Sequence, residues 1–217
     1  MAKGAQVDLF AQQQKAQSRE DVVDGCVVLR AFVDDAAAVV AAVEAVIVVS
    51  PLRHMTTPSG TMSVAMTNCG SRGWTADSSG YAYTTTDPTT TTPWPLLPPT
   101  LQALASSAAS AAGYPDFLPD ACLINQYLPG ASMGLHQDKN ERDKNAPIVS
   151  VSLGLPAVFL WGGAVRTAPV TKLRLEHGDV VVFGGAARMH FHGVSTIKDG
   201  VHPLLGRRRI NLTFRRA

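Results

Sequence analysis

The stretch Leu135-His136-Gln137-Asp138-Lys139 places a histidine and an aspartate two residues apart. On an extended backbone the side chains alternate between two faces, so His136 and Asp138 point the same way. An imidazole beside a carboxylate supplies two ligands of a metal site, and His192 is the natural third. Two histidines and one carboxylate leave positions open on Fe(II), as non-haem oxygenases require. The alternative is a histidine at a strand end beside a solvated aspartate.

The C-terminal segment Arg209-Ile210-Asn211-Leu212-Thr213-Phe214-Arg215 alternates between apolar and polar residues without interruption. This period of two predicts a strand with one apolar face. Its other face carries two arginines with an asparagine and a threonine between them, a row of donors suited to binding carboxylates. An ordinary half-buried strand would instead turn this polar face to water. An iron with open positions needs a reducing cosubstrate, and a dicarboxylate keto acid fits both features.

With these residues the chain resembles the AlkB family of Fe(II)/2-oxoglutarate-dependent dealkylases, and in particular its bacterial DNA-repair members. The resemblance runs from Val7 to Arg215. It rests on His136-x-Asp138, His192 and Arg209-x-Asn211-x-x-x-Arg215, and on the longer stretches 62–70, 113–117 and 177–182. The longer stretches are more specific than the three metal-binding residues, because H-x-D alone is a weak motif.

The resemblance implies a set of site residues and a reaction. The metal-binding and catalytic residues would be His136, Asp138 and His192. The 2-oxoglutarate contacts would be Asn125, Gln126, Tyr127, Arg209, Asn211 and Arg215, with Arg209 on the far carboxylate and Arg215 at the end nearest the metal. The substrate contacts would be Met66, Trp74, Tyr81, Asn140 and Arg166.

The implied reaction is oxidative demethylation of bases such as 1-methyladenine and 3-methylcytosine in DNA, preferably single-stranded. It consumes 2-oxoglutarate and O₂ and releases succinate, CO₂ and formaldehyde. The base would be flipped out and stacked between Trp74 and the ring of His136. Two departures from the family pattern bear on lesion preference: Asn140 stands where the family has an acidic residue, and the segment 57–61 is one residue shorter and lacks a tyrosine.

Composition favours one globular domain of 217 residues, with 46% hydrophobic and 17% charged residues. The net charge of +2 is too small to indicate nucleic-acid binding without a local patch. Three scattered cysteines fit buried thiols in a reducing cytoplasm. We expect a cytoplasmic monomer that does not enter a membrane. Residues 1–20 are expected to form a flexible tail, and residues 21–217 the dioxygenase domain.

The fold expected is α+β and mainly β: a double-stranded β-helix, or jelly roll, at about 120–217, with N-terminal supporting helices. Asp34 and Asp35 predict the start of a helix that runs to about Val49, and a second helix is expected over 100–112. Residues 51–99 would form a nucleotide-recognition lid or, alternatively, a surface insertion. Strands are predicted at 27–29, 122–127, 132–136, 148–154, 157–161, 172–175, 180–183, 188–192 and 209–214.

Three alternatives remain open at this point. The chain could be a cupin-like binding module whose metal is structural and whose pocket holds a small ligand. It could be a dioxygenase that acts on RNA or on a small metabolite. Finally, His190 lies on the same predicted strand face as His192 and is its rival as the metal ligand, although the glycine after His192 favours His192.

Overall fold

The computed structural model describes residues 16–58 and 60–217. Eight strands form the larger sheet: β1 (Ser18–Val23), β2 (Cys26–Arg30), β3 (Arg53–Thr57), β4 (Gly60–Gly70), β7 (Ala121–Tyr127), β9 (Ile148–Gly154), β12 (Val180–Phe183) and β14 (Arg209–Arg215). Four form the smaller sheet: β8 (Met133–His136), β10 (Ala157–Trp161), β11 (Thr171–Leu175) and β13 (His192–Val194). The strands β5 (Gly73–Asp77) and β6 (Gly80–Thr84) form a separate hairpin, and the helices are α1 (Ala36–Val49) and α2 (Pro99–Ala111).

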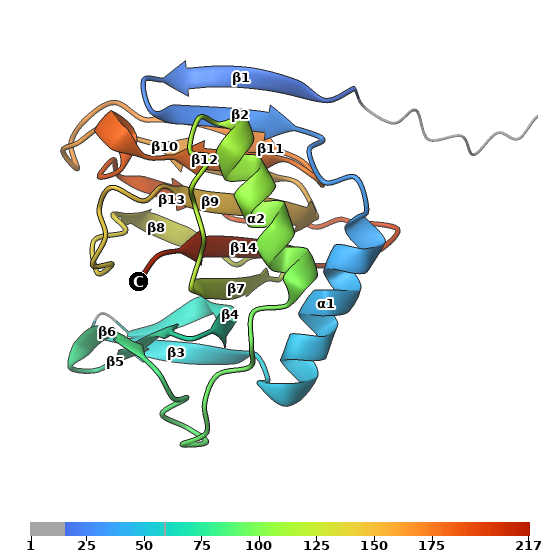
Figure 1. The fold of residues 1–217 in the computed structure, drawn as a ribbon, viewed down its shortest axis with the longest axis vertical. Helices are drawn as coiled ribbons and strands as arrows, with labels where there is room; N and C mark the ends of the chain where they lie inside the picture. Colours follow the sequence, from blue (N-terminus) through green and yellow to red (C-terminus); the bar gives the residue numbers. More distant parts are fainter. Residues whose placement is uncertain (1–15, 59) are drawn as a thin grey trace, which may run out of the picture.

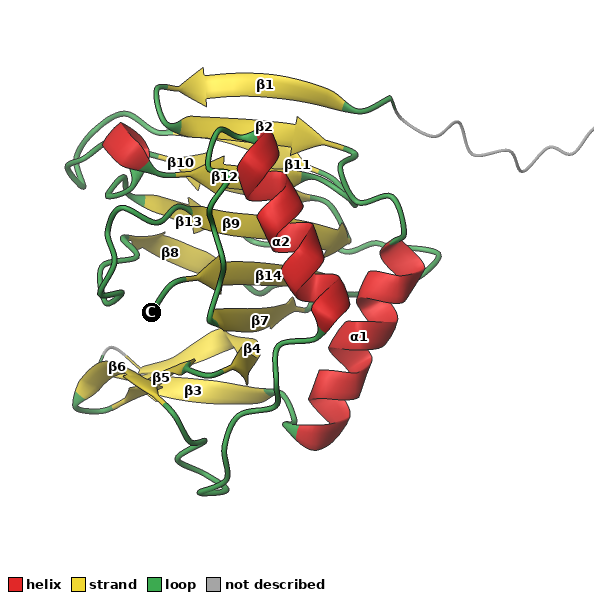
Figure 2. Ribbon diagram, in the orientation of Figure 1, coloured by secondary structure: helices red, strands yellow, loops and turns green. Residues whose placement is uncertain are grey.

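The two sheets and the helices pack as three layers. The larger sheet has the strand order β1-β2-β12-β9-β14-β7-β4-β3, and the smaller has the order β11-β10-β13-β8. Both helices cover one face of the larger sheet, and the smaller sheet lies behind its other face (Figures 1 and 2). One apolar core lies between helices and sheet and a second lies between the sheets. The fold is therefore mainly β, as predicted.

The helices begin and end close to their predicted limits. The carboxylate of Asp35 accepts a hydrogen bond from the backbone N–H of Ala38 at 2.9 Å, so it caps α1. Pro99 is the first residue of α2, a position where proline fits because its φ angle is helical and its missing N–H would have no partner in the helix. Gly113 follows the end of α2 with φ of 98°, a conformation that glycine adopts without strain. No helix in the described part of the chain is long and apolar enough to span a membrane.

The strand β14 lies at the centre of the molecule and separates the two cores. Ile210, Leu212 and Phe214 pack in the core beneath the helices, as their spacing predicted. The polar face of β14 is also buried, because all seven residues of the strand are buried. The alternative of a polar face in water is thus wrong, and the donor row lies inside the protein.

The predicted strand over 188–192 is wrong. A 3₁₀ turn, Gly185–Ala187, ends at Arg188, which has helical dihedral angles, and β13 starts only at His192. The physical reason is the buried guanidinium of Arg188, which donates to the backbone carbonyls of Asp138 at 2.6 Å and Ala146 at 3.0 Å. The backbone turns at this position so that the side chain can reach them.

The N-terminal limit of the domain also needs correction. Residues 1–15 lie outside the described part of the chain, but the expected tail to residue 20 is too long because β1 begins at Ser18. This edge strand pairs with β2 along its whole length and has mainly exposed side chains. It therefore lacks the hydrophobic alternation by which a strand is found in a sequence.

Residues 51–99 combine sheet, hairpin and irregular structure. β3 and β4 extend the larger sheet, while 85–98 contains no strand, as expected for a low-complexity segment. Arg53 on β3 holds this segment through two hydrogen bonds to Asp87, at 2.6 and 2.7 Å. Trp94 packs against Gly73 so closely that a Cβ there would lie 2.4 Å from the indole ring. The segment is therefore fixed against the base of the hairpin.

Candidate active site

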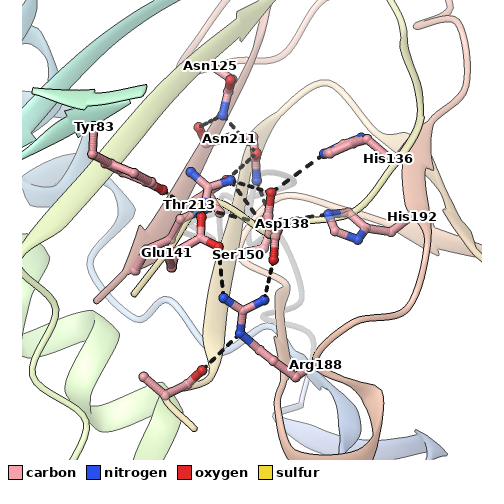
Figure 3. Close-up of polar contacts among 12 residues, drawn as sticks. Tyr83, Asn125, His136, Asp138, Glu141, Ser150, Arg188, His192, Asn211 and Thr213 are labelled. Atoms are coloured by element: carbon pink, nitrogen blue, oxygen red, sulfur yellow. Dashed lines mark hydrogen bonds and ion pairs between the residues drawn. The ribbon is translucent and has the colours of Figure 1, made fainter. Parts of the chain in front are cut away.

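His136, Asp138 and His192 come together at one end of the space between the sheets. His136 ends β8 and is the direct cross-strand partner of His192 on β13. The Nε2 atoms of His136 and His192 lie 3.9 and 3.8 Å from the two carboxylate oxygens of Asp138 (Figure 3). The potential ligand atoms all lie within 4.8 Å of one another. Among the described residues this is the one cluster of three such side chains.

The two histidines are oriented for metal binding through Nε2. The Nδ1 atom of His136 lies 2.9 Å from the carbonyl of Gly134, and that of His192 lies 3.1 Å from the carbonyl of His190. A carbonyl can only accept, so each Nδ1 carries the proton and each Nε2 presents a lone pair to a metal. Burial, with a smaller effect of His136, lowers the pKa of His192 to about 4, so this ring is neutral at physiological pH.

The carboxylate of Asp138 is held ionised by its neighbours. Burial alone would raise the pKa of this group, but Arg215 and the two histidines outweigh burial and hold it well below its usual value. Arg215 is itself buried and its pKa is raised, because Asp138 more than compensates its burial. The cluster therefore offers two imidazoles and one anion, the donor set that Fe(II) takes in non-haem oxygenases.

Buried polar atoms beside the metal cluster fit a dicarboxylate. Arg209 is 1% exposed, and its Nη2 donates to Ser152 Oγ at 3.0 Å. Its Nε and Nη1 are buried and have no hydrogen-bond partner in the described part of the chain. Asn125 Oδ1 is also buried without a partner, but it is an acceptor and cannot bind a carboxylate. Buried donors left without partners are costly, and a carboxylate at Arg209 would satisfy both. Arg209 therefore fits one carboxylate of 2-oxoglutarate.

Gln126 does not share this environment. Side chains alternate along β7, so Asn125 and Tyr127 face the smaller sheet while Gln126 faces the helices. Its Oε1 accepts from Arg208 at 3.2 Å, and Arg208 also binds Glu44 on α1. Gln126 does not line the cavity, and its contact with 2-oxoglutarate stays a prediction.

The expected substrate contacts all line one cavity of about 680 Å³ together with the metal-binding residues. These contacts are Met66, Trp74, Tyr81, Asn140 and Arg166. The rings of Trp74 and Tyr81 stack on each other with centroids 5.5 Å apart. Asn140 and Arg166 are exposed at the rim, whereas Met66 is fully buried in the core between the sheets. Met66 thus contributes a wall of the cavity from within the core.

Sequence reasoning missed residues that position the site from behind. Glu141 and Arg188 are 5% and 2% exposed and bind each other at 3.0 Å. Asn68, on β4, accepts from the backbone N–H of Trp74 and donates to its carbonyl, both at 2.9 Å, and so holds the backbone of a residue that lines the cavity. A charged residue within a few positions of a metal ligand was the available signal for Glu141 and Arg188. Nothing in the sequence pointed to Asn68.

Comparison with known proteins agrees with this geometry. Residues 25–215 match the family model of the 2OG-Fe(II) oxygenase superfamily. The chain therefore belongs to this superfamily, whose enzymes use Fe(II), 2-oxoglutarate and O₂. The prediction of a dioxygenase is confirmed, and the cupin-like binding module is not supported.

Similar proteins indicate to which group within the superfamily the chain belongs. The chain is 54% identical to the alpha-ketoglutarate-dependent dioxygenase AlkB of Escherichia coli, over 97% of this chain and 98% of that protein. It is 42% identical to the DNA N(6)-methyladenine demethylase ALKBH1C of Arabidopsis thaliana, over 46% of this chain and 25% of that protein. The structure of OsALKBH1 matches with a TM-score of 0.82 at 30% identity, covering 92% of this chain and 100% of that one. Within the superfamily, the chain groups with the AlkB dioxygenases.

Proposed function

We propose that this dioxygenase removes methyl groups from base nitrogens of alkylated DNA, with 1-methyladenine and 3-methylcytosine in a single strand as substrates. The observation that carries the proposal is a single cavity that is lined both by the aromatic side chain of Trp74 and by the metal-binding histidines. A flat ring over a reactive centre suits a nucleobase, because every base offers a face for stacking. The demethylase activity in the name of the Arabidopsis relative supports the same class of substrate.

Each group of residues has a separate task in this reaction. Bound by His136, Asp138 and His192, Fe(II) supplies the oxidising chemistry with O₂ and 2-oxoglutarate. Arg209 would hold the cosubstrate through the two donors that lack partners. Trp74 and the ring of His136 would hold the base between them, and Arg166 at the rim would contact the strand. The hydroxylated methyl group then leaves the base nitrogen as formaldehyde, with succinate and CO₂ as the other products.

The hairpin β5–β6 would act as the nucleotide-recognition lid of the fold. It pairs with neither of the two larger sheets and carries both Trp74 and Tyr81. We interpret the two packed sheets as the jelly roll expected for this superfamily, with the lid at one mouth. We propose that the enzyme is a monomer in the cytoplasm, where single-stranded DNA is found during replication and transcription.

The experiment that tests the proposal is formaldehyde release from a methylated DNA oligonucleotide in the presence of Fe(II), 2-oxoglutarate and O₂. Succinate should form in equal amounts, and an Asp138→Ala variant should form neither product. Rates on the same lesions in single-stranded DNA, double-stranded DNA and RNA show which strand state and which sugar the enzyme prefers. We expect single-stranded DNA to react fastest. Succinate without formaldehyde from any oligonucleotide would contradict a nucleic-acid substrate and favour a small metabolite.

A further inference from the structure

A buried cluster of four charged side chains lies directly behind the metal-binding carboxylate. Asp138 and Glu141 are its acids and Arg188 and Arg215 its bases, and each is at most 8% exposed. Arg215 bridges the acids: its Nη2 lies 2.9 Å from Asp138 Oδ2, and its Nε lies 3.4 Å from Glu141 Oε1. Arg188 completes the set by donating to Glu141 Oε2 at 3.0 Å. The four charges cancel, so the position of each depends on its partners.

A tyrosine from the hairpin enters this cluster. Tyr83, on β6, donates its hydroxyl hydrogen to Glu141 Oε1 at 2.7 Å (Figure 3). Arg215 approaches the same oxygen. Burial raises the pKa of Tyr83 far above its usual value, so the hydroxyl keeps its proton and remains a donor. The distance and the burial make this one of the stronger neutral-to-charged hydrogen bonds in proteins.

Few other polar contacts join the hairpin to its surroundings. Asn68 binds the backbone of Trp74, and the indole of Trp94 donates to the carbonyl of Thr84. Among the described residues, the Tyr83 hydroxyl makes the one hydrogen bond from the hairpin to the segment that carries Asp138. The hairpin and the metal ligand are thus linked by a continuous set of side chains: Tyr83, Glu141, Arg215 and Asp138.

We propose that Tyr83 is a positioning residue that couples closure of the β5–β6 hairpin to the geometry of the metal-binding carboxylate. Its hydroxyl holds Glu141, which shares Arg215 with Asp138. Without this donor, Glu141 is held less firmly, and Arg215, which bridges Glu141 and Asp138, no longer keeps the position that orients the Asp138 carboxylate for the metal. The inference depends on the proposed function only for the hairpin's role as a lid over a base.

Coupling of this kind is reciprocal. If the hydroxyl of Tyr83 favours the carboxylate geometry that binds the metal, then metal binding favours the hairpin position that makes the hydrogen bond. Partners behind metal ligands commonly change metal affinity when they are removed. Tyr83 acts through two intervening side chains, so we expect a loss of about three- to tenfold, the range for one hydrogen bond.

The test uses the full chain with Mn(II) in place of Fe(II), which prevents turnover, and without nucleic acid. Mn(II) affinity in the presence of 2-oxoglutarate is measured for the wild type, Tyr83→Phe and Tyr114→Phe. The last is a matched control, because Tyr114 lies outside the site cavity. Hydrogen exchange of the amides in 73–84 is followed with and without Mn(II) and 2-oxoglutarate. Thermal unfolding verifies that each variant is folded.

We expect Mn(II) with 2-oxoglutarate to slow exchange in the hairpin of the wild type and of Tyr114→Phe, but not of Tyr83→Phe. Only Tyr83→Phe should lose Mn(II) affinity. Glu141→Gln should show the same loss, and combining it with Tyr83→Phe should add little, because both act in one pathway. Wild-type affinity together with wild-type protection in Tyr83→Phe would overturn the proposal, as would fully additive losses in the double variant.

These outcomes are independent of the outcome for the proposed function. A protein with the coupling but without activity on any methylated oligonucleotide would retain this inference and lose the assignment of the substrate. Conversely, the wild type could demethylate DNA while Tyr83→Phe matches it in Mn(II) affinity and in hydrogen exchange. That result would retain the assignment of the substrate and overturn this inference.

Discussion

Arg215 donates through Nη2 to both carboxylate oxygens of Asp138, at 3.0 and 2.9 Å. The same aspartate faces the Nε2 atoms of His136 and His192 with those oxygens. Arg215 thus orients the metal-binding carboxylate and keeps it ionised without a metal. Partners of this kind raise the affinity of a metal site by fixing its ligands in advance. The expected contact of Arg215 with 2-oxoglutarate stays a prediction.

Replacing His192 with alanine should abolish metal binding, because two ligands remain of three. His190→Ala is the matched comparison: its ring packs on Trp161 with centroids 5.4 Å apart and takes no part in the metal cluster. Bound Fe(II), measured by metal analysis, and succinate formation should vanish in the first variant and persist in the second. Retention of both by His192→Ala would make His190 the ligand instead.

Arg209→Lys should weaken 2-oxoglutarate binding by roughly tenfold or more, since losing a charged hydrogen bond costs about 1.5–3 kcal/mol. Lysine keeps the charge but cannot reproduce the two-donor geometry of the guanidinium. Arg207→Lys is the control, because Arg207 is exposed and pairs with Asp199 at the surface. Titration of 2-oxoglutarate into the Mn(II) form measures the effect. Equal affinities in the two variants would mean that the cosubstrate lies elsewhere.

Trp74→Ala should weaken binding of a methylated single strand, because one stacking plane is worth on the order of 1–3 kcal/mol per base. Trp74→Phe retains an aromatic face and should lose less. Affinity for Mn(II) and 2-oxoglutarate should stay unchanged in both, because Trp74 contacts neither predicted site. Fluorescence anisotropy of a labelled oligonucleotide separates the variants, and unaltered strand binding by Trp74→Ala would refute the stacking role.

Asn140→Asp should raise repair of the cationic lesions 1-methyladenine and 3-methylcytosine relative to neutral 3-methylthymine. Asn140 lines the cavity with an uncharged amide, whereas aspartate would add a negative charge beside the base. Glu141 is buried and its two oxygens already accept from Tyr83 and Arg188, so it is less available to a base. Rates on matched oligonucleotides test this. An unchanged ratio of cationic to neutral repair would mean that Glu141 or the hairpin, and not Asn140, sets the lesion preference.

His177 and His202 should make the protein less stable as the pH falls. Their rings lie 4.3 Å apart, and each Nδ1 accepts a backbone N–H, of Gly154 and Leu204 respectively. Burial lowers the pKa of both, and His202 lowers that of His177 further. The unfolded chain therefore binds protons first as the pH drops through about 6.5, and the free energy of unfolding decreases below that pH.

The measurement for this pair is urea unfolding at several pH values between about 7.5 and 5. His202→Gln should lose less stability over that interval than the wild type, since one of the two shifted groups is gone. His54→Gln, which alters an exposed histidine, should follow the wild-type curve. A His202→Gln protein whose pH dependence equals that of the wild type would show that the pair does not titrate on unfolding.

Local patterns in the sequence predicted most of the elements that form the core. The cap at Asp35, the glycine after α2 and the alternation of β14 act over a few residues and are therefore visible in the chain itself. The donor set of the metal site was predictable for the same reason, since two of its three ligands stand two residues apart. The strands β1, β3 and β4 and the hairpin β5–β6 were not predicted. The side chains of β1 are mainly exposed and carry no strong periodicity, and the other four strands lie in the segment that was expected to form a lid or a surface insertion.

The sequence by itself thus determined the chemistry of this protein: the two imidazoles, the carboxylate and the buried arginines. Only the tertiary structure decided that β13 pairs with β8 and sets His192 opposite His136. It also decided that Arg188 turns inward, that Gln126 faces α1, and that Tyr83 reaches Glu141 across 58 positions of the chain. These contacts depend on how distant segments pack, because the two residues of each contact lie far apart in the sequence and no short stretch of it contains both.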